Sequence, residues 1–308
     1  MKRICLFAGF HPKNQISQYV VHYVRALSEL ADVYYLADCE MPQEQLAKLA
    51  PYVKGAWAQR HGSHDFGSWK ILIARIGWET VRSYDECIFV NDSVFAPLTC
   101  LKSFVEKGSS QPVDAWALNA YEYQYLEVYF YVFKKSVLVS PMFEAFVQNI
   151  TKQNSINDVI IKYEHGLTKM LRSGKFTYKV FASFYGSAAD EWRQCIKIGL
   201  PILKTKVLTK YRIYVEHEWL PGWRKFVKKH TAYPLELIDQ HLVSMGVDPH
   251  QFDTLYFLLK SCLWTVKRWR RKLFRIHFSK DVKIVVLFGI TIVNTDIHFT
   301  CYPVETFK

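Results

Sequence analysis

The sequence predicts an α/β protein in which helices flank a mostly parallel sheet. Short apolar runs of strand length alternate with amphipathic stretches of helical period over about the first 90 residues. Turn-forming residues, mainly Gly, Pro, Asn and Asp, separate the two kinds of segment. Strands and helices that alternate in this way form a parallel sheet with right-handed crossovers, so the carboxyl ends of the strands share one edge.

The elements follow one another in a regular order. Apolar runs predict strands at 4–10, 33–38, 54–61 and 87–90. Apolar residues spaced three and four apart predict the intervening helices, at 17–32, 42–53 and 66–83. Beyond Pro97 the same patterns predict helices at 98–108, 137–150 and 156–175, and strands at 113–120 and within 125–138. We find no internal repeat and no low-complexity segment.

The composition narrows the possible partners. The 308 residues carry a formal net charge of +12, which favours an anionic membrane surface, a polyanionic substrate or nucleic acid. Seven cysteines are scattered singly without a CxxC pair, which is typical of reduced thiols in a cytosolic protein. The apolar start is too short for a signal sequence, and no segment reaches the roughly 18 apolar residues of a spanning helix.

Three small polar residues, Asn91, Asp92 and Ser93, end the strand at 87–90. Such residues hydrogen-bond their own backbone, so the triplet can be an ordinary turn before a helix that Pro97 starts. In open α/β sheets, however, ligands bind beyond the carboxyl ends of strands, where a carboxylate can meet a sugar or a metal-bound phosphate. The triplet alone fits both interpretations.

A second polar loop, at residues 59–70, joins a predicted strand to a predicted helix. Gly62 and Gly67 flank Asp65 in this loop. Backbone N–H groups and the helix dipole at such a junction favour phosphate or a nucleotide, although a flexible loop with an Asp helix cap explains the pattern as well. Together with the Asn-Asp-Ser triplet, the loop predicts a pocket for a nucleotide diphosphate.

Five ordered motifs carry a resemblance to a known family: DFGSWK, YDECIFVNDSVFAP, YFYVFKKSVLVSP, VIIKYEHGLTKML and GLPILKTKVL. Over residues 1–210 the chain resembles the rhamnan synthesis protein F family of polysaccharide glycosyltransferases. The resemblance implies a GT-A-like, Rossmann-type fold. It also implies transfer of a sugar, often L-rhamnose from dTDP-L-rhamnose with inversion, onto a bacterial surface polysaccharide or a lipid-linked O-antigen or capsule glycan.

The resemblance assigns the loop at 59–70 to the nucleotide-sugar donor. It implies that Asp65 contacts the nucleotide, and that Arg60 and Gly62 line the same pocket, with Gly67 beside them. His61 stands where family members commonly have Asn.

The triplet after the fourth strand corresponds to the Asp-x-Asp motif of GT-A enzymes. Asp92 matches one carboxylate of that motif, whereas Asn91 and Ser93 stand where carboxylates are usual. A single carboxylate holds hydrated Mg²⁺ or Mn²⁺ more weakly than two, so any metal is expected on Asp92 and metal dependence is left open.

A cation is expected to stabilise the leaving diphosphate if the metal is weakly bound or absent. Lys204 matches a lysine of the family, and Lys206 and Lys70 are further candidates. The alternative for each, and the preferred one for Lys206 and Lys70, is a solvated surface lysine.

Sugar transfer also needs a base for the acceptor hydroxyl, which typically contributes about 10²–10⁴-fold in rate. Glu164 opens a predicted helix on the acceptor side, and related enzymes place an acidic base similarly. The alternative is that Glu164 only complements the helix dipole. His165 follows it but faces elsewhere on the helix, so a plain surface imidazole is the alternative for this residue.

Aromatic residues gather between 114 and 131 and can stack on sugar rings, although most are expected in the core. Trp116 and Tyr121 lie nearest a loop and are the predicted acceptor-site residues. Tyr125 and Glu127 stand where family members commonly have His and Gln, which leaves the usual acceptor open.

The charge excess concentrates in the carboxyl-terminal region, which we predict to be a mainly helical, membrane-associating unit at 211–308 after a catalytic domain at 1–210. On a helix at 264–276, basic residues occupy the face opposite the apolar ones. This pattern favours an anionic inner membrane leaflet and a peripheral, cytoplasmic enzyme, although a helix packed on the domain fits too. The apolar run at 282–293 predicts a strand.

Two classes of function remain open. The first is a glycosyltransferase, with dTDP-L-rhamnose or another nucleotide sugar as donor and a glycan as acceptor. The second is a non-catalytic binding protein that uses its basic helix. Because the aromatic and basic residues of that helix lie on opposite faces, unlike a base-stacking platform, no nucleic acid is expected as partner.

Overall fold

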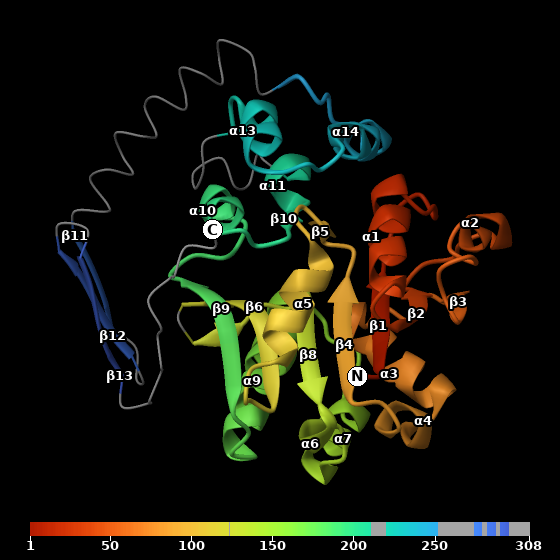
Figure 1. Cartoon of the computed structure of the whole chain (residues 1–308), viewed down its shortest axis with the longest axis horizontal. Helices are drawn as coiled ribbons and strands as arrows, with labels where there is room; N and C mark the ends of the chain where they lie inside the picture. The colour runs from red at the N-terminus through yellow and green to blue at the C-terminus, as the bar shows by residue number, and fades with distance from the viewer. Residues whose placement is uncertain (123, 211–219, 252–273, 279–281, 288–289, 296–308) are drawn as a thin grey trace.

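The structure, a computed structural model, describes residues 1–122, 124–210, 220–251, 274–278, 282–287 and 290–295. An eight-stranded sheet with the order β3-β2-β1-β4-β8-β6-β7 forms its centre, and β9 pairs with β6 (Figure 1). The strands are β1 Arg3–Gly9, β2 Asp32–Ala37, β3 Gly55–Ala58, β4 Glu86–Asn91, β6 Ala115–Tyr121, β7 Tyr125–Leu126, β8 Phe130–Lys134 and β9 Tyr178–Phe184.

The first half of the sheet confirms the predicted parallel arrangement. β1 pairs in parallel with β2 on one side and β4 on the other, and β3 extends β2. The connecting helices are α1 Gln18–Ser28, α2 Gln43–Ala47, α3 His64–Ile76 and α4 Trp78–Arg82. The single helix expected at 66–83 is broken at Gly77, which has a φ of +89°. A left-handed residue of this kind ends a helix.

The second half of the sheet contains antiparallel pairings, made by β8 and by the short β7, which runs antiparallel to β6. β8 runs antiparallel to both β4 and β6, and β9 runs parallel to β6. The pattern of residues 178–184 was not assigned as a strand from sequence. As a result, the start of β8 lies at the same sheet edge as the carboxyl ends of β4 and β6.

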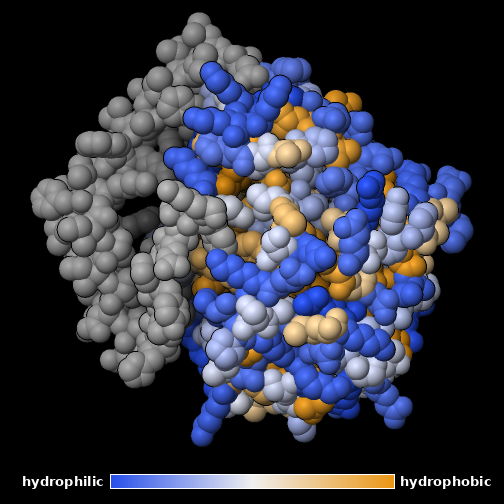
Figure 2. All heavy atoms as spheres, viewed as in Figure 1, coloured by the Kyte–Doolittle hydropathy of each residue, from blue (hydrophilic) through white to orange (hydrophobic). Residues whose placement is uncertain are grey.

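The remaining helices cover the two faces of the sheet. They are α5 Leu101–Ser109, α6 Lys135–Leu138, α7 Pro141–Gln148, α8 Ile156–Val159, a π-helical turn Ile160–Glu164, α9 His165–Ser173, α10 Trp192–Lys197 and α11 Lys206–Thr209. β1 supplies Cys5 and Phe7 to one apolar core and Ile4 and Leu6 to the other. This alternation buries the strand on both faces, as expected for the middle of a parallel sheet. The surface is mainly hydrophilic on the face that Figure 2 shows.

A two-stranded antiparallel pair lies beyond the carboxyl end of β4 in Figure 1. β5 Val94–Phe95 pairs with β10 Leu203–Lys204. The helix expected to start at Pro97 begins only at Leu101, because residues 94–95 continue as strand. The pair brings residue 204 against the Asn-Asp-Ser triplet.

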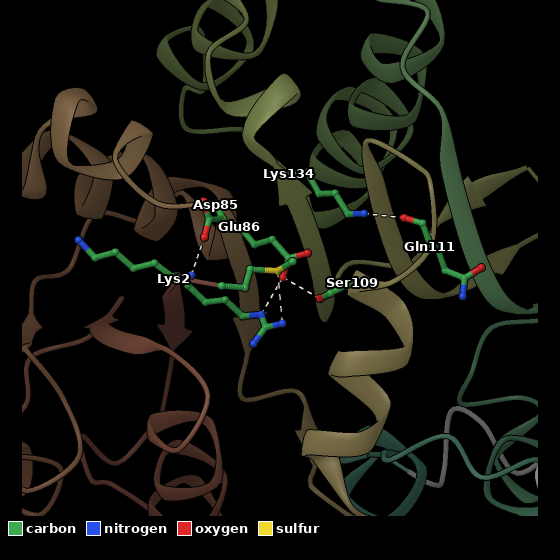
Figure 3. A network of polar contacts seen from close by, with 8 residues as sticks. Lys2, Asp85, Glu86, Ser109, Gln111 and Lys134 are labelled. Carbon is green, nitrogen blue, oxygen red and sulfur yellow. Dashed lines mark hydrogen bonds and ion pairs between the residues drawn. The ribbon is translucent and has the colours of Figure 1, made fainter.

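The opposite end of β4 holds a separate polar network (Figure 3). Glu86 is 1% exposed, and its Oε2 accepts hydrogen bonds from Arg3 Nε at 2.7 Å and Ser109 Oγ at 2.7 Å. Nearby, the Lys2 backbone N–H donates to Asp85 Oδ2 at 2.6 Å. This network ties the beginnings of β1 and β4 to α5.

The described part of the carboxyl-terminal region is not wholly helical. It contains α13 Trp223–His230 and α14 Leu235–Ser244, followed by an antiparallel sheet of β11 Phe274–Phe278, β12 Val282–Leu287 and β13 Ile290–Thr295. The strand predicted at 282–293 is thus confirmed as two strands. Most of the predicted basic helix at 264–276 lies outside the described residues, and its last three residues belong to β11. No helix in the described ranges has the length and apolar character needed to cross a membrane.

The helices α13 and α14 pack against the first part of the chain. Trp223 and Leu242 belong to the same apolar core as the residues of β1 and α1. His241 of α14 lies 3.2 Å from Ser17 Oγ and packs edge-on against Tyr19, with ring centroids 4.7 Å apart. The division at residue 210 stays a prediction.

Candidate active site

The site is built around the carboxyl end of β4. Asn91, the last residue of β4, is 1% exposed, and its Nδ2 donates to Asp65 Oδ2 at 2.6 Å and to the Val128 carbonyl at 2.7 Å. Its Oδ1 accepts from Ser93 Oγ at 2.6 Å and from the Ser93 backbone N–H at 3.1 Å. The triplet is therefore a turn that is stabilised by its own side chains, and the bond from Asn91 to Asp65 also connects it to α3.

Asp92 is directed toward the end of β1. Its Oδ2 accepts a hydrogen bond from the Phe10 backbone N–H at 2.6 Å, and its carbonyl accepts from Tyr19 Oη at 2.7 Å. Burial raises the pKa of Asp92 to about 8, and the negative charge of Asp65 adds to this rise. A carboxyl group with this pKa is mainly protonated at neutral pH, and a cation beside it would favour the ionised form.

Asp65 lies in the first turn of α3 and faces the same centre. Burial raises its pKa, while the hydrogen bond from Asn91 and the charge of Lys204 act in the opposite direction. The bond to Asn91 shows that the Asp65 carboxylate faces the site. The helix cap is Ser63, so the alternative that Asp65 caps the helix does not hold.

The loop before α3 is organised by Asp38, which sequence reasoning did not identify. Asp38 follows β2 and is 8% exposed; its Oδ1 accepts from the backbone N–H groups of His61 and Gly62 at 2.8 Å each. Its Oδ2 accepts from the His64 N–H at 3.2 Å. These N–H groups are therefore engaged within the protein, contrary to the expectation that they are available for phosphate.

The two glycines of this loop have structural roles. Gly62 has a φ of +66°, a conformation that L side chains rarely adopt. Gly67 is buried, and an added Cβ would lie 2.8 Å from His61 Nδ1 and overlap Ser63. Arg60 is exposed at the end of β3. Glycine thus lets α3 approach its own preceding loop.

Lys204 reaches the Asn-Asp-Ser triplet from β10. It is 8% exposed, its Nζ donates to Ser93 Oγ at 3.3 Å, and it lies 4.4 Å from the centre of the Tyr129 ring. Burial lowers the pKa of this lysine, and the carboxylates of Glu127, Glu164 and Asp65 oppose that effect. The predicted role of Lys204 toward the leaving diphosphate stays a prediction, and the structure places its ammonium beside Ser93 of the triplet.

Glu164 ends the π-helical turn that precedes α9. Burial raises its pKa to about 7, the charge of Lys204 lowers it, and the charges of Glu127 and Asp65 raise it further. A π-helical turn interrupts the regular helix and is frequent at functional sites. With a pKa near neutrality, Glu164 can take up and release a proton under physiological conditions.

Other candidates lie away from this cluster. Lys70 donates to the carbonyls of Gln148 and Ile150 at 2.8 and 2.7 Å, so its ammonium is held at the end of α7. Trp116 is 1% exposed and stacks on Phe130 with ring centroids 5.6 Å apart, so it is a core residue and not an accessible acceptor contact.

The hairpin between β6 and β7 retains an accessible aromatic residue. Tyr121 is half-buried at the end of β6 and pairs with Tyr125 in β7. His165 is half-buried and stacks on Tyr125 with ring centroids 3.6 Å apart. Lys206 begins α11, two residues after Lys204.

The site thus combines side chains from distant segments. Asn91 donates to Asp65 and Lys204 donates to Ser93. The charge of Lys204 acts on Asp65 and Glu164, and the charge of Asp65 acts on Asp92. Within the described ranges, no group of three or more His, Cys, Asp and Glu side chains forms a metal-binding cluster. The arrangement can neutralise a diphosphate with one lysine and can accept a proton at Glu164.

The sequence profile of one protein family, described as rhamnan synthesis protein F, matches residues 33–285. The chain belongs to this family. Members of the rhamnan synthesis protein F family are glycosyltransferases of polysaccharide synthesis, and membership implies a nucleotide-sugar donor and a glycan acceptor. The mixed but mostly parallel sheet, flanked by helices, confirms the predicted α/β fold.

Solved structures of glycosyltransferases show weaker likenesses to this chain. S. aureus TarS 1–349 is 10% identical, with a TM-score of 0.39 over 96% of this chain and 97% of that chain. GlyE of Streptococcus pneumoniae TIGR4 is 14% identical, with a TM-score of 0.36 over 81% and 65%. A glycosyltransferase involved in glycosylation of the PBCV-1 major capsid is 15% identical, with a TM-score of 0.29 over 57% and 80%. No curated protein sequence matches the chain.

Proposed function

We propose that this chain transfers L-rhamnose from dTDP-L-rhamnose, with inversion, onto a growing cell-surface polysaccharide or lipid-linked glycan. The family supports the sugar and the polymer. The observation that carries the proposal is the position of Lys204, which donates to Ser93 in the polar turn at the end of β4 and whose charge acts on Glu164.

Each residue has a distinct task in this reaction. The acceptor hydroxyl oxygen bonds to the anomeric carbon while Glu164 takes its proton. The bond between that carbon and the diphosphate oxygen breaks, and its electron pair leaves with the dTDP group. Lys204 is preorganised against Ser93, where its charge stabilises the leaving diphosphate. A single displacement of this kind inverts the anomeric centre.

Asp65 and Asp92 form the donor side of the proposed site. The negative charge of Asp65 raises the pKa of Asp92, so a cation beside Asp92 would be favoured. This donor set fits a hydrated Mg²⁺ or Mn²⁺ held through Asp92, which would neutralise the diphosphate. The same pair can instead be neutralised by protonation of Asp92.

The first experiment is a titration of the full chain with dTDP-L-rhamnose, UDP-glucose and GDP-mannose, each with and without Mg²⁺ and Mn²⁺. Selective thermal stabilisation by dTDP-L-rhamnose is the expected result. Selective stabilisation by another donor would contradict rhamnose as the transferred sugar but would still support a glycosyltransferase. A folded protein that responds to no donor would favour the non-catalytic binding protein.

The assignment of residues is tested separately. Asp92→Ala and Glu164→Gln are expected to fold normally and to lose transfer. Retained turnover in both variants would contradict the site, whichever sugar is transferred.

We further propose that the enzyme acts as a peripheral protein at the cytoplasmic face of the membrane. In the described residues, α13 buries Trp223 and Val227 and exposes Lys225, Lys228 and Lys229. Each basic side chain near an anionic surface contributes about 1 kcal/mol. Cosedimentation with phosphatidylglycerol vesicles, absent with phosphatidylcholine and weakened by Lys228→Glu, is the expected result; equal binding to both would contradict the proposal.

A further inference from the structure

Glu127 is a buried carboxylate that sequence reasoning noted only as a departure from the family. It lies between β7 and β8 and is 8% exposed. Its Oε2 accepts hydrogen bonds from Asn119 Nδ2 and from the Ala188 backbone N–H, the latter at 2.7 Å. Both donors are neutral. A carboxylate buried with neutral donors alone is costly unless a cation lies nearby.

A continuous set of contacts leads from Glu127 to Lys204. Asn119 donates to Glu127 and accepts a hydrogen bond from Tyr129 Oη. The ring of Tyr129 in turn lies 4.4 Å from the Lys204 ammonium. Asn119 and Tyr129 are fully buried, so their side chains have little freedom to move. The carboxylate and the lysine are thus fixed relative to one another through two rigid neighbours.

We propose that Glu127 is a positioning residue: the permanent buried counter-ion that keeps Lys204 charged and fixed against the triplet at the end of β4. This inference rests on the proposed function in assigning Lys204 to the leaving diphosphate. The inference rests on the contacts that lead from Glu127 through Asn119 and Tyr129 to Lys204, and on the burial of Asn119 and Tyr129. The electrostatic effect on Lys204 agrees with it. Of the charges that raise the pKa of Lys204, that of Glu127 has the largest effect.

The other charged groups around Lys204 cannot act as its permanent counter-ion. Glu164 must change its protonation state during the reaction, and Asp65 faces the donor. Lys206 is a like charge and lowers the pKa of Lys204. Glu127 alone is removed from the reacting groups, because Asn119 and Ala188 occupy its Oε2. A counter-ion outside the proton transfer keeps the lysine charged throughout turnover.

The test separates the charge of Glu127 from its hydrogen bonds. In Glu127→Gln the amide oxygen can accept both bonds while the negative charge is lost. Lysine labelled with ¹³C at Cε is titrated by NMR in the full chain, with Lys204→Arg used to assign the resonance. We expect the Lys204 titration midpoint to fall by about one unit or more, a tenfold change in its proton affinity.

A second readout follows turnover. In Glu127→Gln, the alkaline limb of the kcat/KM profile is expected to move to lower pH by the same amount as the Lys204 titration midpoint. A merely structural role would instead lower activity equally at all pH values. Glu127→Asp, which retains the charge, is expected to restore the profile in large part. The matched control is Glu86→Gln, which neutralises a buried glutamate at the other end of β4 and should leave the Lys204 midpoint unchanged.

The outcomes are distinguishable. A folded Glu127→Gln protein with an unchanged Lys204 midpoint would overturn the inference. The NMR titration needs no donor, so a shifted midpoint in a chain that binds no nucleotide sugar would keep the charge pairing and reject the proposed function. If Glu127→Gln alone does not fold, adding Lys204→Met should restore folding by removing the unpaired charge; a double variant no better folded would also overturn the pairing.

Discussion

The two ends of β4 both carry buried acidic side chains, and they are neutralised differently. At the beginning of the strand, Glu86 is paired with Arg3 at 2.7 Å and accepts a further bond from Ser109 (Figure 3). At the carboxyl end, Asp65 receives its bond from the neutral amide of Asn91, and Asp92 from a backbone N–H. Glu86 is therefore paired directly with a cation, whereas Asp65 and Asp92 accept their hydrogen bonds from neutral groups and Lys204 acts on Asp65 only through its charge.

The largest expected effect concerns the carboxyl end. Glu164→Gln should lower the rate of transfer by about 10²–10⁴-fold, because the variant cannot accept the hydroxyl proton. In the wild type, kcat/KM should rise as the pH rises through about 7, where Glu164 loses its proton, and the variant should lack this rise.

Initial rates over pH 5.5–8.5 measure both effects. Glu144→Gln is the control, since Glu144 is ion-paired with Arg82 outside the site and its substitution should leave the profile intact. A pH profile that is unchanged in Glu164→Gln would contradict the assignment of Glu164 as the base.

The next effect tests the beginning of β4. Arg3→Met leaves Glu86 buried without its cation, which should lower the free energy of unfolding by about 3–5 kcal/mol. Urea denaturation measures the loss. Donor binding by the folded protein should be unchanged, and a loss below about 1 kcal/mol would show that the two ends of β4 do not differ in this respect.

A smaller effect concerns the packing that shapes the site. Gly67→Ala places a Cβ 2.8 Å from His61 Nδ1, which should cost about 1–3 kcal/mol of stability and weaken donor binding. Gly166→Ala is a matched helical control, since its Cβ would meet Phe146 at an ordinary 3.5 Å. Equal melting temperatures for the two variants would contradict the close approach of α3 to its loop.

The smallest effect sharpens the contrast in charge. The pKa of Asp92 is raised in the folded state from an ordinary value near 3.8 to about 8, so its contribution to stability is lost as the pH rises between these values. Asp92→Asn removes this dependence, and its amide oxygen can still accept the Phe10 bond. The difference in unfolding free energy between variant and wild type should therefore change by about 1 kcal/mol or more from pH 5 to pH 8. A constant difference would show that Asp92 is charged in the folded protein.

Local patterns predicted the parts of the site that depend on one segment. The apolar run before Asn91 predicted the strand, and the predicted parallel sheet put the triplet at the carboxyl end of that strand. Lys70 could have been excluded by helix geometry, since it lies five residues after Asp65 and is rotated about 140° from it on a helix. The prediction that Trp116 is an accessible acceptor contact was wrong, because β6 is buried on both faces and its aromatic side chain lies in the core.

Contacts between distant segments could not be read in this way. Asp38 acts on residues 23 to 26 positions later in the sequence, through backbone groups that no side-chain pattern reveals. Glu127 looks like an ordinary polar residue of a hairpin until Asn119 and Ala188 are seen beside it. Burial and partners, which decide the behaviour of a charged group, arise only from the tertiary structure.

The pairing of β5 with β10 has a consequence for the synthesis of the chain. Lys204 and its partner Ser93 lie 111 residues apart in sequence. As the chain leaves the ribosome, β4 and its acidic turn are complete long before the lysine emerges. The loop must close across this separation, which makes the contact a late and slow step of folding. The proposed site therefore receives Lys204 only after all strands of the central sheet have been synthesised.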